Sequence, residues 1–392
     1  MGANTDVIVV GRGPAGLLMA TLVVQHSGTV TIVADGQGTL PLWGGQWDFR
    51  NYADDGRPLV DPYQWWGDLL GGELAWRTRW SRVATLWHEL GVLESPDIPN
   101  RNRWILSPLG HLRPTYLAPR WQWCQDQPGQ FILIGFPGLA DFSVQAMARV
   151  YEATSGVGVQ AVHLPTPPGW RPHWTAINWA WYLDSRAGQE WLIGEVDRII
   201  DASPTPLAFP QVLGVDGVEA LRERLMQHLG RVVGEVALPP PSVGGLRITR
   251  RWERWLKHRG VQFVTGHVTG VTRDSAKLAN GRQLSGSPVL ASGGILGGGL
   301  YAEPAGNIRD PILGTIVGSL PQDRIGSVGH RQVRSTVPVI GRMVGGWDPD
   351  RHGDGGALTL WTVDEAFDAI WTGLGTTEAA PGVVRSQSLR VK

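Results

Sequence analysis

The chain of 392 residues contains only one cysteine, Cys124. A single thiol excludes intramolecular disulfides, iron–sulfur clusters held by cysteines of this chain, and four-cysteine zinc sites. A reducing cytoplasm fits this composition. Cys124 stands between Trp123 and Gln125, and we expect it to be a passive thiol.

The sequence also lacks an excess of charge of either sign, because 35 Lys and Arg residues balance 35 Asp and Glu residues. The balance provides no overall field to attract nucleic acid or an anionic membrane, so no nucleic-acid partner is expected. No segment approaches the roughly 18 apolar residues of a membrane span, and the apolar start has no basic leader. We therefore expect a chain without a signal peptide, either soluble or held at a membrane by a partner.

The most informative stretch runs from Asp6 to Gly16 and reads D-V-I-V-V-G-R-G-P-A-G. Its apolar run, Val7 to Val10, predicts a buried strand, and Leu17 to Val24 predicts the buried side of a helix. A second strand pattern follows from Val30 to Val33. The G-x-G-x-x-G motif therefore stands where a phosphate-binding turn belongs, between a strand and a helix of a βαβ unit.

Each glycine of the motif has a physical role. Gly11 suits the tight turn, Gly13 lets the backbone approach a pyrophosphate, and Gly16 lets helix and strand pack closely. The helix N-terminus adds free N–H groups and about half a positive charge. The motif therefore predicts a nucleotide-binding unit.

The end of the second strand is less regular. In an adenine dinucleotide site an acidic residue at this place normally holds the ribose hydroxyl pair. The expected position falls on Ala34, and Asp35 comes one residue later. Adjacent strand residues point to opposite faces, so Asp35 substitutes only if the strand end curls.

Beyond this unit the sequence alternates between strand and helix patterns. The expected strands lie at 105–113 (two, around a turn), 131–135, 159–164, 232–238, 261–264, 268–271, 276–278, 288–291 and 337–341. The expected helices lie within 62–95 and at 141–153, 190–200, 218–229, 246–258 and 357–372. Asp141 is an expected N-cap, 202–210 is expected to be turns, and Asn280-Gly281 predicts a hairpin. The arginines of 246–258 are expected on a solvated helix face.

Tryptophan, in contrast to cysteine, is abundant at 20 residues, which crowd two regions near 65–87 and 170–181. Core and interface packing is the favoured interpretation, and an aromatic electron-hopping path is the alternative. Glycine gathers at 345–346 and 353–356, before the last helix pattern. Such a turn offers backbone N–H groups to a flavin or phosphate, although a surface loop would have the same composition.

Several short motifs, in a fixed order, carry a family resemblance. They are S-P-L-G and L-R at 107–113, G-L and D-F at 138–142, L-P-P and S-V at 238–243, L-A-S-G at 290–293, G-G-L and A-E at 298–303, N-I-R-D-P-I-L-G at 307–314, and G-G-W-D-P at 345–349. From near its start to about residue 372 the chain resembles the B subunit of anaerobic sn-glycerol-3-phosphate dehydrogenase.

Together with the patterns above, the resemblance implies an α/β fold. A Rossmann-like FAD/NAD(P)-binding flavoprotein domain of the glutathione-reductase type is expected, discontinuous and with an inserted α/β cap or substrate domain. The expected boundaries are 1–95 and 236–375 for the flavin domain, 96–235 for the insert and 376–392 for a C-terminal tail.

The resemblance also implies a function: a flavoprotein subunit of a quinone-linked enzyme that oxidises glycerol 3-phosphate to dihydroxyacetone phosphate. Its partners would be a catalytic A-type flavoprotein subunit and an iron–sulfur C-type subunit that passes electrons to membrane quinone. The chain would be cytoplasmic and peripheral on the inner face of the membrane through a partner. FMN is the implied cofactor, in agreement with the missing acid at Ala34, and FAD is the alternative.

The resemblance and the loop together imply a set of cofactor-binding positions, and no metal site. They are Gly11, Gly13, Pro14, Ala15, Gly16, Ala34, Asp35, Gly44, Gly45, Gln46, Ser292, Gly293, Gly341, Gly345, Gly346, Asp348, Gly353, Asp354, Gly355 and Gly356. Asp48, like Gly45, matches the loop expected near the flavin ring. Two departures stand out: Trp43, Gly44 and Gln46 replace family serines, and Asp354 takes a position often held by Cys. Asp354 is expected to contact a ribityl hydroxyl or to face solvent.

Hydride transfer from a secondary alcohol needs a base for the hydroxyl proton and cations for the phosphate. His111, Arg113 and Arg309 are the candidates, and turn or ion-pair roles are the alternative for each. Substrate oxidation is expected mainly on the A-type subunit. Two other functions stay open: a self-contained FAD-dependent oxidoreductase on another small acid or amine, and a structural subunit without flavin.

Overall fold

The computed structural model describes residues 5–66, 72–201, 203–319, 337–344 and 349–375. The chain divides into two compact units. Unit 1 comprises Met1–Thr39 and Glu253–Lys392, and unit 2 comprises Leu40–Trp252. The expected boundaries at 95/96 and 235/236 both fall inside unit 2, and the flavin and cap roles given to those segments stay predictions.

Unit 1 is built on a four-stranded parallel sheet in the order β10-β2-β1-β14. Its strands are β10 (Gln262–Thr265), β2 (Val30–Ala34), β1 (Val7–Val10) and β14 (Ser287–Leu290). Val10 pairs with Val33 on one side and with Leu290 on the other. The carboxyl ends of these strands therefore meet at one edge, which is where open α/β sheets bind ligands.

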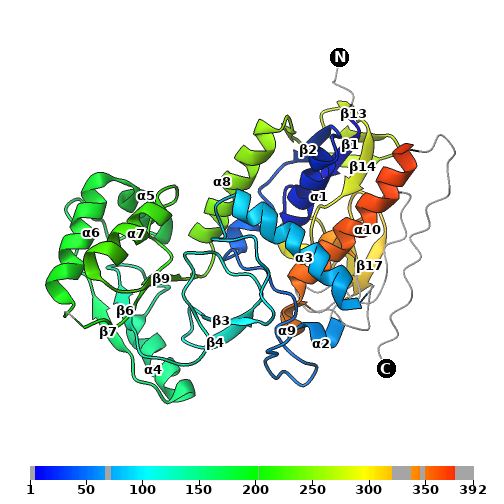
Figure 1. Ribbon diagram of the computed structural model, residues 1–392. Helices are drawn as coiled ribbons and strands as arrows, with labels where there is room; N and C mark the ends of the chain where they lie inside the picture. Colours follow the sequence, from blue (N-terminus) through cyan, green and yellow to red (C-terminus); the bar gives the residue numbers. More distant parts are fainter. Residues whose placement is uncertain (1–4, 67–71, 202, 320–336, 345–348, 376–392) are drawn as a thin grey trace. The chain divides into compact units, whose positions relative to one another are not determined.

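Two long helices pack side by side in this unit, α1 (Pro14–Gln25) and α10 (Gly355–Gly375), as Figure 1 shows. Both were predicted. Gly28 ends the α1 segment where a Cβ would lie 2.7 Å from Val23 and 3.0 Å from Trp371. The close approach of α1 and α10 thus uses a residue without a side chain.

The strand predicted at 337–341 is wrong. Val339 makes only an isolated bridge to Leu290, and the chain then forms a short 3₁₀ helix, η3 (Gly341–Met343). Gly341 has a φ of +71°, a left-handed conformation that ends extended backbone.

Two small antiparallel sheets complete unit 1. The first joins β11 (Val268–Val271), β12 (Ser275–Leu278) and β13 (Gln283–Ser285), and the Asn280-Gly281 hairpin between the last two is confirmed. The second joins β15 (Tyr301–Ala302), β16 (Asn307–Arg309) and β17 (Ile316–Ser319), while η2 (Ile295–Gly297) follows β14.

Unit 2 has its own parallel sheet, in the order β7-β6-β8-β9. Its strands are β7 (Gln160–His163), β6 (Ile132–Gly135), β8 (Leu207–Pro210) and β9 (Val233–Val236), and its helices are α4 (Val144–Ser155), α5 (Ala176–Asp184), α6 (Arg186–Ile199) and α7 (Val218–Leu229). Parallel neighbours need such crossover connections. In Figure 1, α5, α6 and α7 lie grouped together. The mixed α/β class is confirmed.

Three local expectations in unit 2 are corrected. Residues 207–210 are a fully buried strand, because β8 pairs with strands on both sides. The N-cap of α4 is Ser143 in place of Asp141, and its hydroxyl accepts a hydrogen bond from the N–H of Ala146. The α5 helix falls where no helix was predicted.

A fourth correction concerns α8 (Val243–His258), whose arginines are not all on a solvated face. Arg247 is fully buried, and Arg251 is paired with Glu219 at 2.7 Å. The buried arginine has a carboxylate partner, Glu235, which the helix pattern alone does not reveal.

An aromatic core fills the rest of unit 2. It is covered by η1 (Leu40–Leu42), α2 (Tyr63–Trp66), α3 (Gly72–Glu89) and the antiparallel sheet β4-β3-β5 (Leu112–Thr115, Arg103–Leu106 and Cys124–Gln125). The ring of Phe49 lies 5.1 to 5.3 Å from the rings of Trp76, Trp80 and Tyr116. Trp47 and Trp87 are equally buried. Core packing of the tryptophans is confirmed.

Cys124 lies on β5, and burial raises the pKa of its thiol to about 11. The thiol is therefore protonated at neutral pH, and a protonated thiol is a poor nucleophile.

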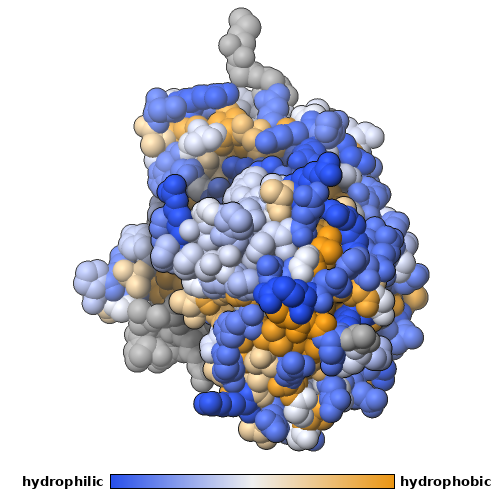
Figure 2. All heavy atoms as spheres, turned by 90° about the vertical axis from the view of Figure 1, so that its left-hand side faces the viewer, coloured by the Kyte–Doolittle hydropathy of each residue, from blue (hydrophilic) through white to orange (hydrophobic). Residues whose placement is uncertain are grey.

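The surface on the side of α5–α7, shown in Figure 2, mixes hydrophilic side chains with smaller hydrophobic areas. Trp181 and Val232 are among the exposed apolar residues of unit 2, at 47% and 57% exposure. Within the described ranges, no helix is both long enough and apolar enough to cross a membrane.

We expect Trp80→Ala to lower the free energy of unfolding by about 3–5 kcal/mol, because it empties the centre of a rigid aromatic cluster. Trp181→Ala is the matched control, since this indole is 47% exposed and stacks on Arg250; its cost should be about 1 kcal/mol or less. Urea unfolding of both variants measures the difference. Equal costs would show that the cluster is not the core of unit 2.

Candidate phosphate and cofactor site

The turn between β1 and α1 depends on two close backbone approaches. Gly11 has a φ of +121°, and a Cβ there would lie 2.1 Å from the carbonyl oxygen of Ala291. A Cβ on Gly16 would lie 2.2 Å from the carbonyl oxygen of Gly11. Both distances are far below contact range, so the turn and packing roles predicted for these glycines are confirmed.

Gly13 differs from its neighbours in facing open space. It is the N-cap of α1 with an extended backbone (φ −83°), and a Cβ there would meet no atom within 4 Å. No side chain caps the helix, and Pro14 takes the first helical position, where its missing N–H costs nothing. The N–H groups of Ala15 and Gly16 have no intrahelical acceptor at this position. The residues present therefore fit a phosphate group.

The chain after β2 returns to this turn. Gly38 has a φ of +63°, and a Cβ there would lie 3.2 Å from the Cα and N atoms of Gly13. The sequence predicted only a loop leaving the sheet here. The glycines of 36–38 were the available signal, since close backbone approach needs a residue without a side chain.

Residues at the end of β2 and β10 are joined twice. The carbonyl oxygen of Ala34 accepts a hydrogen bond from the N–H of Gly266 at 3.1 Å. The Asp35 carboxylate accepts a hydrogen bond from Nδ1 of His267 at 2.7 Å. His267 was not among the predicted site residues.

The segment after β14 lies against the same turn. The N–H of Ala291 donates to the carbonyl oxygen of Val10 at 2.8 Å, and Ser292 and Gly293 follow. Gly293 has a φ of +86°, with Gly297 Cα at 3.7 Å as the nearest atom to a Cβ. The Ser292 hydroxyl lies 2.7 Å from the sulfur of Met343.

Gly341 packs onto the first turn of α1. A Cβ on this glycine would lie 2.9 Å from Cβ of Ala15, and its N–H donates to the hydroxyl of Thr362 at 2.9 Å. The predicted residues of β1–α1, β14 and η3 are therefore neighbours in unit 1.

Arg12, inside the glycine motif, is held by an ion pair that the sequence did not reveal. Its guanidinium donates two hydrogen bonds to the carboxylate of Glu253, whose side chain is 8% exposed. The same guanidinium lies over the ring of Phe263, with Lys257 near both. Arg12 therefore anchors the turn to the C-terminal part of α8, and its charge is largely neutralised.

The glycine-rich turn before α10 has a different character from the first. Asp354 directly precedes α10, its carbonyl accepts from the N–H of Leu358, and it is 1% exposed. The expectation that Asp354 faces solvent is thus wrong. A carboxylate at a helix N-terminus is stabilised by the helix dipole, and His352 lies 3.9 Å away. Gly353 precedes it with a φ of +60°, and Gly355 and Gly356 open α10; Gly345, Gly346 and Asp348 lie outside the described residues.

The predicted residues near Gly45 belong to unit 2. Gly45 has a φ of +99°, and a Cβ would lie 2.7 Å from Ile248. The Gln46 amide donates to Gln122 at 2.8 Å. Asp48 accepts from the Thr115 hydroxyl at 2.6 Å and pairs with Arg113 at 3.4 Å.

The three predicted catalytic residues occupy different places. Arg113 of β4 is 31% exposed and also reaches the Gln46 side chain at 3.4 Å. His111 is exposed in the turn before β4, where its N–H donates to the Ser107 hydroxyl. Arg309 of β16 belongs to unit 1 and is paired with Glu303 at 2.7 Å, which lowers the pKa of that carboxyl.

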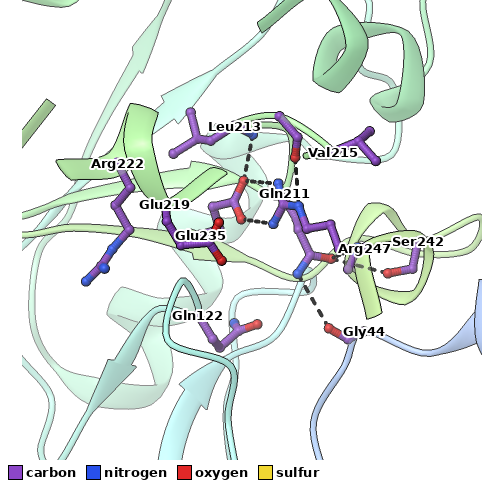
Figure 3. A network of polar contacts seen from close by, with 12 residues as sticks. Gly44, Gln122, Gln211, Leu213, Val215, Glu219, Arg222, Glu235, Ser242 and Arg247 are labelled. Atoms are coloured by element: carbon purple, nitrogen blue, oxygen red, sulfur yellow. Dashed lines mark hydrogen bonds and ion pairs between the residues drawn. The ribbon is translucent and has the colours of Figure 1, made fainter. Parts of the chain in front are cut away.

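A buried polar network, drawn in Figure 3, supports the Gly44 loop. Gln211 donates to the carbonyl of Gly44 at 3.4 Å and accepts from Ser242 at 3.2 Å. Beside it the fully buried Arg247 pairs with Glu235, and Glu235 also accepts from the N–H of Leu213 at 2.6 Å.

Comparing Gly13→Ala with Gly11→Ala should separate the two kinds of glycine. Gly13→Ala should leave the melting temperature within a degree or two of wild type, because its Cβ meets no atom and its φ suits alanine. Gly11→Ala should be strongly destabilising, because it combines a left-handed φ with a clash against Ala291. Thermal unfolding measures both, and a tolerated Gly11→Ala would contradict the described turn.

Breaking the buried pair of Figure 3 should be costly. Glu235→Ala leaves the Arg247 charge buried without its carboxylate, and we expect a loss of about 3–5 kcal/mol in unfolding free energy. Glu190→Ala is the control, since its pair with Arg186 is exposed and should contribute little. Equal midpoints in urea for the two variants would contradict the assignment.

Unit 1 thus belongs to the α/β folds that combine a parallel sheet with a glycine turn suited to phosphate. No family model matches the chain. It is similar to the B subunit of the probable anaerobic glycerol-3-phosphate dehydrogenase of Halobacterium salinarum, with 27% identity over 77% of each chain. It is also similar to the B subunits of the anaerobic glycerol-3-phosphate dehydrogenases of Pectobacterium carotovorum, at 25% identity over 94% of each chain, and Yersinia pseudotuberculosis, at 26% over 91% and 95%. The resemblance seen in the motifs is confirmed.

Solved structures were also compared. The chain is similar to L-amino acid deaminase from Proteus myxofaciens (14% identity, TM-score 0.28, 75% of this chain and 46% of that one). It is similar to PqsL from P. aeruginosa as well (12% identity, TM-score 0.37, 96% and 89%). It therefore spans about half the length of the deaminase.

Proposed function

We propose that this chain is the flavoprotein B-type subunit of an anaerobic, quinone-linked glycerol-3-phosphate dehydrogenase. The observation that carries the proposal is that relatives of this one name match up to 94% of the chain, including its phosphate-binding turn. In the proposal, unit 1 is a discontinuous Rossmann-like flavin domain, and unit 2 supplies the inserted cap or substrate domain.

The proposed cofactor is a flavin, which when bound accepts a hydride and releases electrons one at a time. Gly13, Ala15 and Gly16 would hold its phosphate with backbone N–H groups and the dipole of α1. Ser292, Gly293 and Gly341 line the same turn. The family resemblance implies FMN, with FAD as the alternative.

The roles at the substrate follow from charge. Glycerol 3-phosphate needs a cation for its phosphate and a base for the secondary hydroxyl. Arg113 is the best placed cation in unit 2, because its contacts to Asp48 and Gln46 are both long and part of its surface is exposed. His111 lies two residues away as the candidate base. Arg309 would first have to leave Glu303 to bind an anion, so we propose an ion-pair role for it.

Electrons must leave this chain through partners. Its single cysteine cannot hold a cluster, so the iron–sulfur centres would lie in a C-type subunit that passes electrons to quinone. Substrate oxidation would take place mainly on an A-type subunit. The assembly would sit on the cytoplasmic face of the membrane, held there by a partner.

The test is glycerol 3-phosphate-dependent reduction of an artificial acceptor by the chain alone and by the chain co-expressed with A-type and C-type subunits. We expect turnover by the assembly and none by the isolated chain. Gly13→Ala in the assembly should lower turnover roughly tenfold or more, because the methyl group displaces the phosphate from its N–H donors.

Two outcomes would contradict the proposal. Turnover of another small acid or amine by the isolated chain would establish a self-contained oxidoreductase. Full activity of an assembly whose B-type chain holds no flavin would establish a structural subunit.

A further inference from the structure

The Asp35–His267 pair lies at the ligand-binding edge of the parallel sheet in unit 1. Asp35 is the first residue after β2, and His267 is the second after β10, the adjacent strand. The carboxyl end of β1, which leads into the phosphate turn, is on the other side of β2. The pair therefore stands one strand away from the proposed phosphate position, on the same edge.

The pair settles which way the Asp35 side chain turns. Alternation along β2 leaves the orientation of Asp35 open, since Ala34 holds the usual acidic position. The Gly266 N–H bond to the Ala34 carbonyl fixes the two strand ends against each other, and His267 Nδ1 then holds Asp35 Oδ2 at 2.7 Å. The carboxylate is thus held along the sheet edge, as a strand-end acid would be.

The other carboxylate oxygen, Oδ1, is available. Among the described residues it has no hydrogen-bond partner, and the Asp35 side chain is 64% exposed. A carboxylate in this state accepts the hydrogen bonds of a vicinal diol, which is the role of the strand-end acid in dinucleotide sites. Gly36, the next residue, leaves open space beside it, since a Cβ there would meet no atom within 4 Å.

We propose that Asp35, oriented by His267, binds the ribose diol of an adenine dinucleotide, so that the chain takes FAD in preference to FMN. The inference rests on the proposed flavin function and specifies its cofactor. FMN ends at the phosphate and has no second ribose, so Asp35 contributes nothing to its binding. His267 is a positioning residue in this account and need not touch the flavin.

The experiment is a titration of flavin-depleted full-length chain with FAD and with FMN, followed by flavin fluorescence. We expect FAD to bind roughly 10- to 100-fold more tightly than FMN, as for two hydrogen bonds to a charged acceptor. Asp35→Ala should remove this preference and leave the FMN dissociation constant unchanged. Asp274→Asn, an exposed acid of the β11–β12 turn, is the matched control and should change neither constant.

Substitutions of His267 test the positioning role. His267→Ala should weaken FAD binding by about three- to tenfold, because an unoriented carboxylate loses part of the diol contact. His267→Asn can donate to Asp35 from a similar position and should restore most of the affinity. A structural role of His267 would weaken FMN and FAD equally, which would contradict the positioning role.

The outcomes separate the two proposals. Equal wild-type affinities for FAD and FMN, or an Asp35→Ala effect on both flavins, would overturn the dinucleotide inference and leave the flavin function standing. Gly13→Ala should weaken both flavins, as it acts on the shared phosphate. Failure of wild type to bind either flavin would overturn the proposed function itself.

Discussion

The constraint on which unit 1 depends is the contact of three backbone segments around Gly11. The turn after β1 passes so close to Ala291 and to the start of α1 that neither Gly11 nor Gly16 has room for a Cβ. This closeness places β1, α1 and the end of β14 in one arrangement, and it leaves the first N–H groups of α1 facing the open side of Gly13. Phosphate binding is thus a consequence of how the strand and helix are packed.

Buried charge fixes a second part of each unit. Arg12 is tied to Glu253 in unit 1, and Arg247 to Glu235 in unit 2, with the acceptor carboxylates almost fully buried. Such pairs gain little over an apolar core, but removing one partner leaves a costly charge. They therefore set geometry more than stability. The loop at Gly44 is held by main-chain and amide contacts to the same region, through Gln211.

Sequence patterns predicted what depends on local periodicity and on glycine. The strand at β1, the helix α7 and the hairpin at Gly281 follow from the residues themselves. Patterns failed where long-range pairing decides: β8 is a strand because it is flanked on both sides, and Arg247 is buried because Glu235 waits in another element. His267 had no sequence signal, since its role appears only when β10 lies beside β2.

The central claim is that the Gly11–Gly16 turn holds a flavin. The most direct measurement is the visible absorption spectrum of the purified full-length chain, followed by acid release and mass determination of any chromophore. The account predicts flavin bands and a stoichiometric flavin, retained by the chain alone or in its assembly. A colourless chain that takes up neither FAD nor FMN, alone or with its partners, would contradict it.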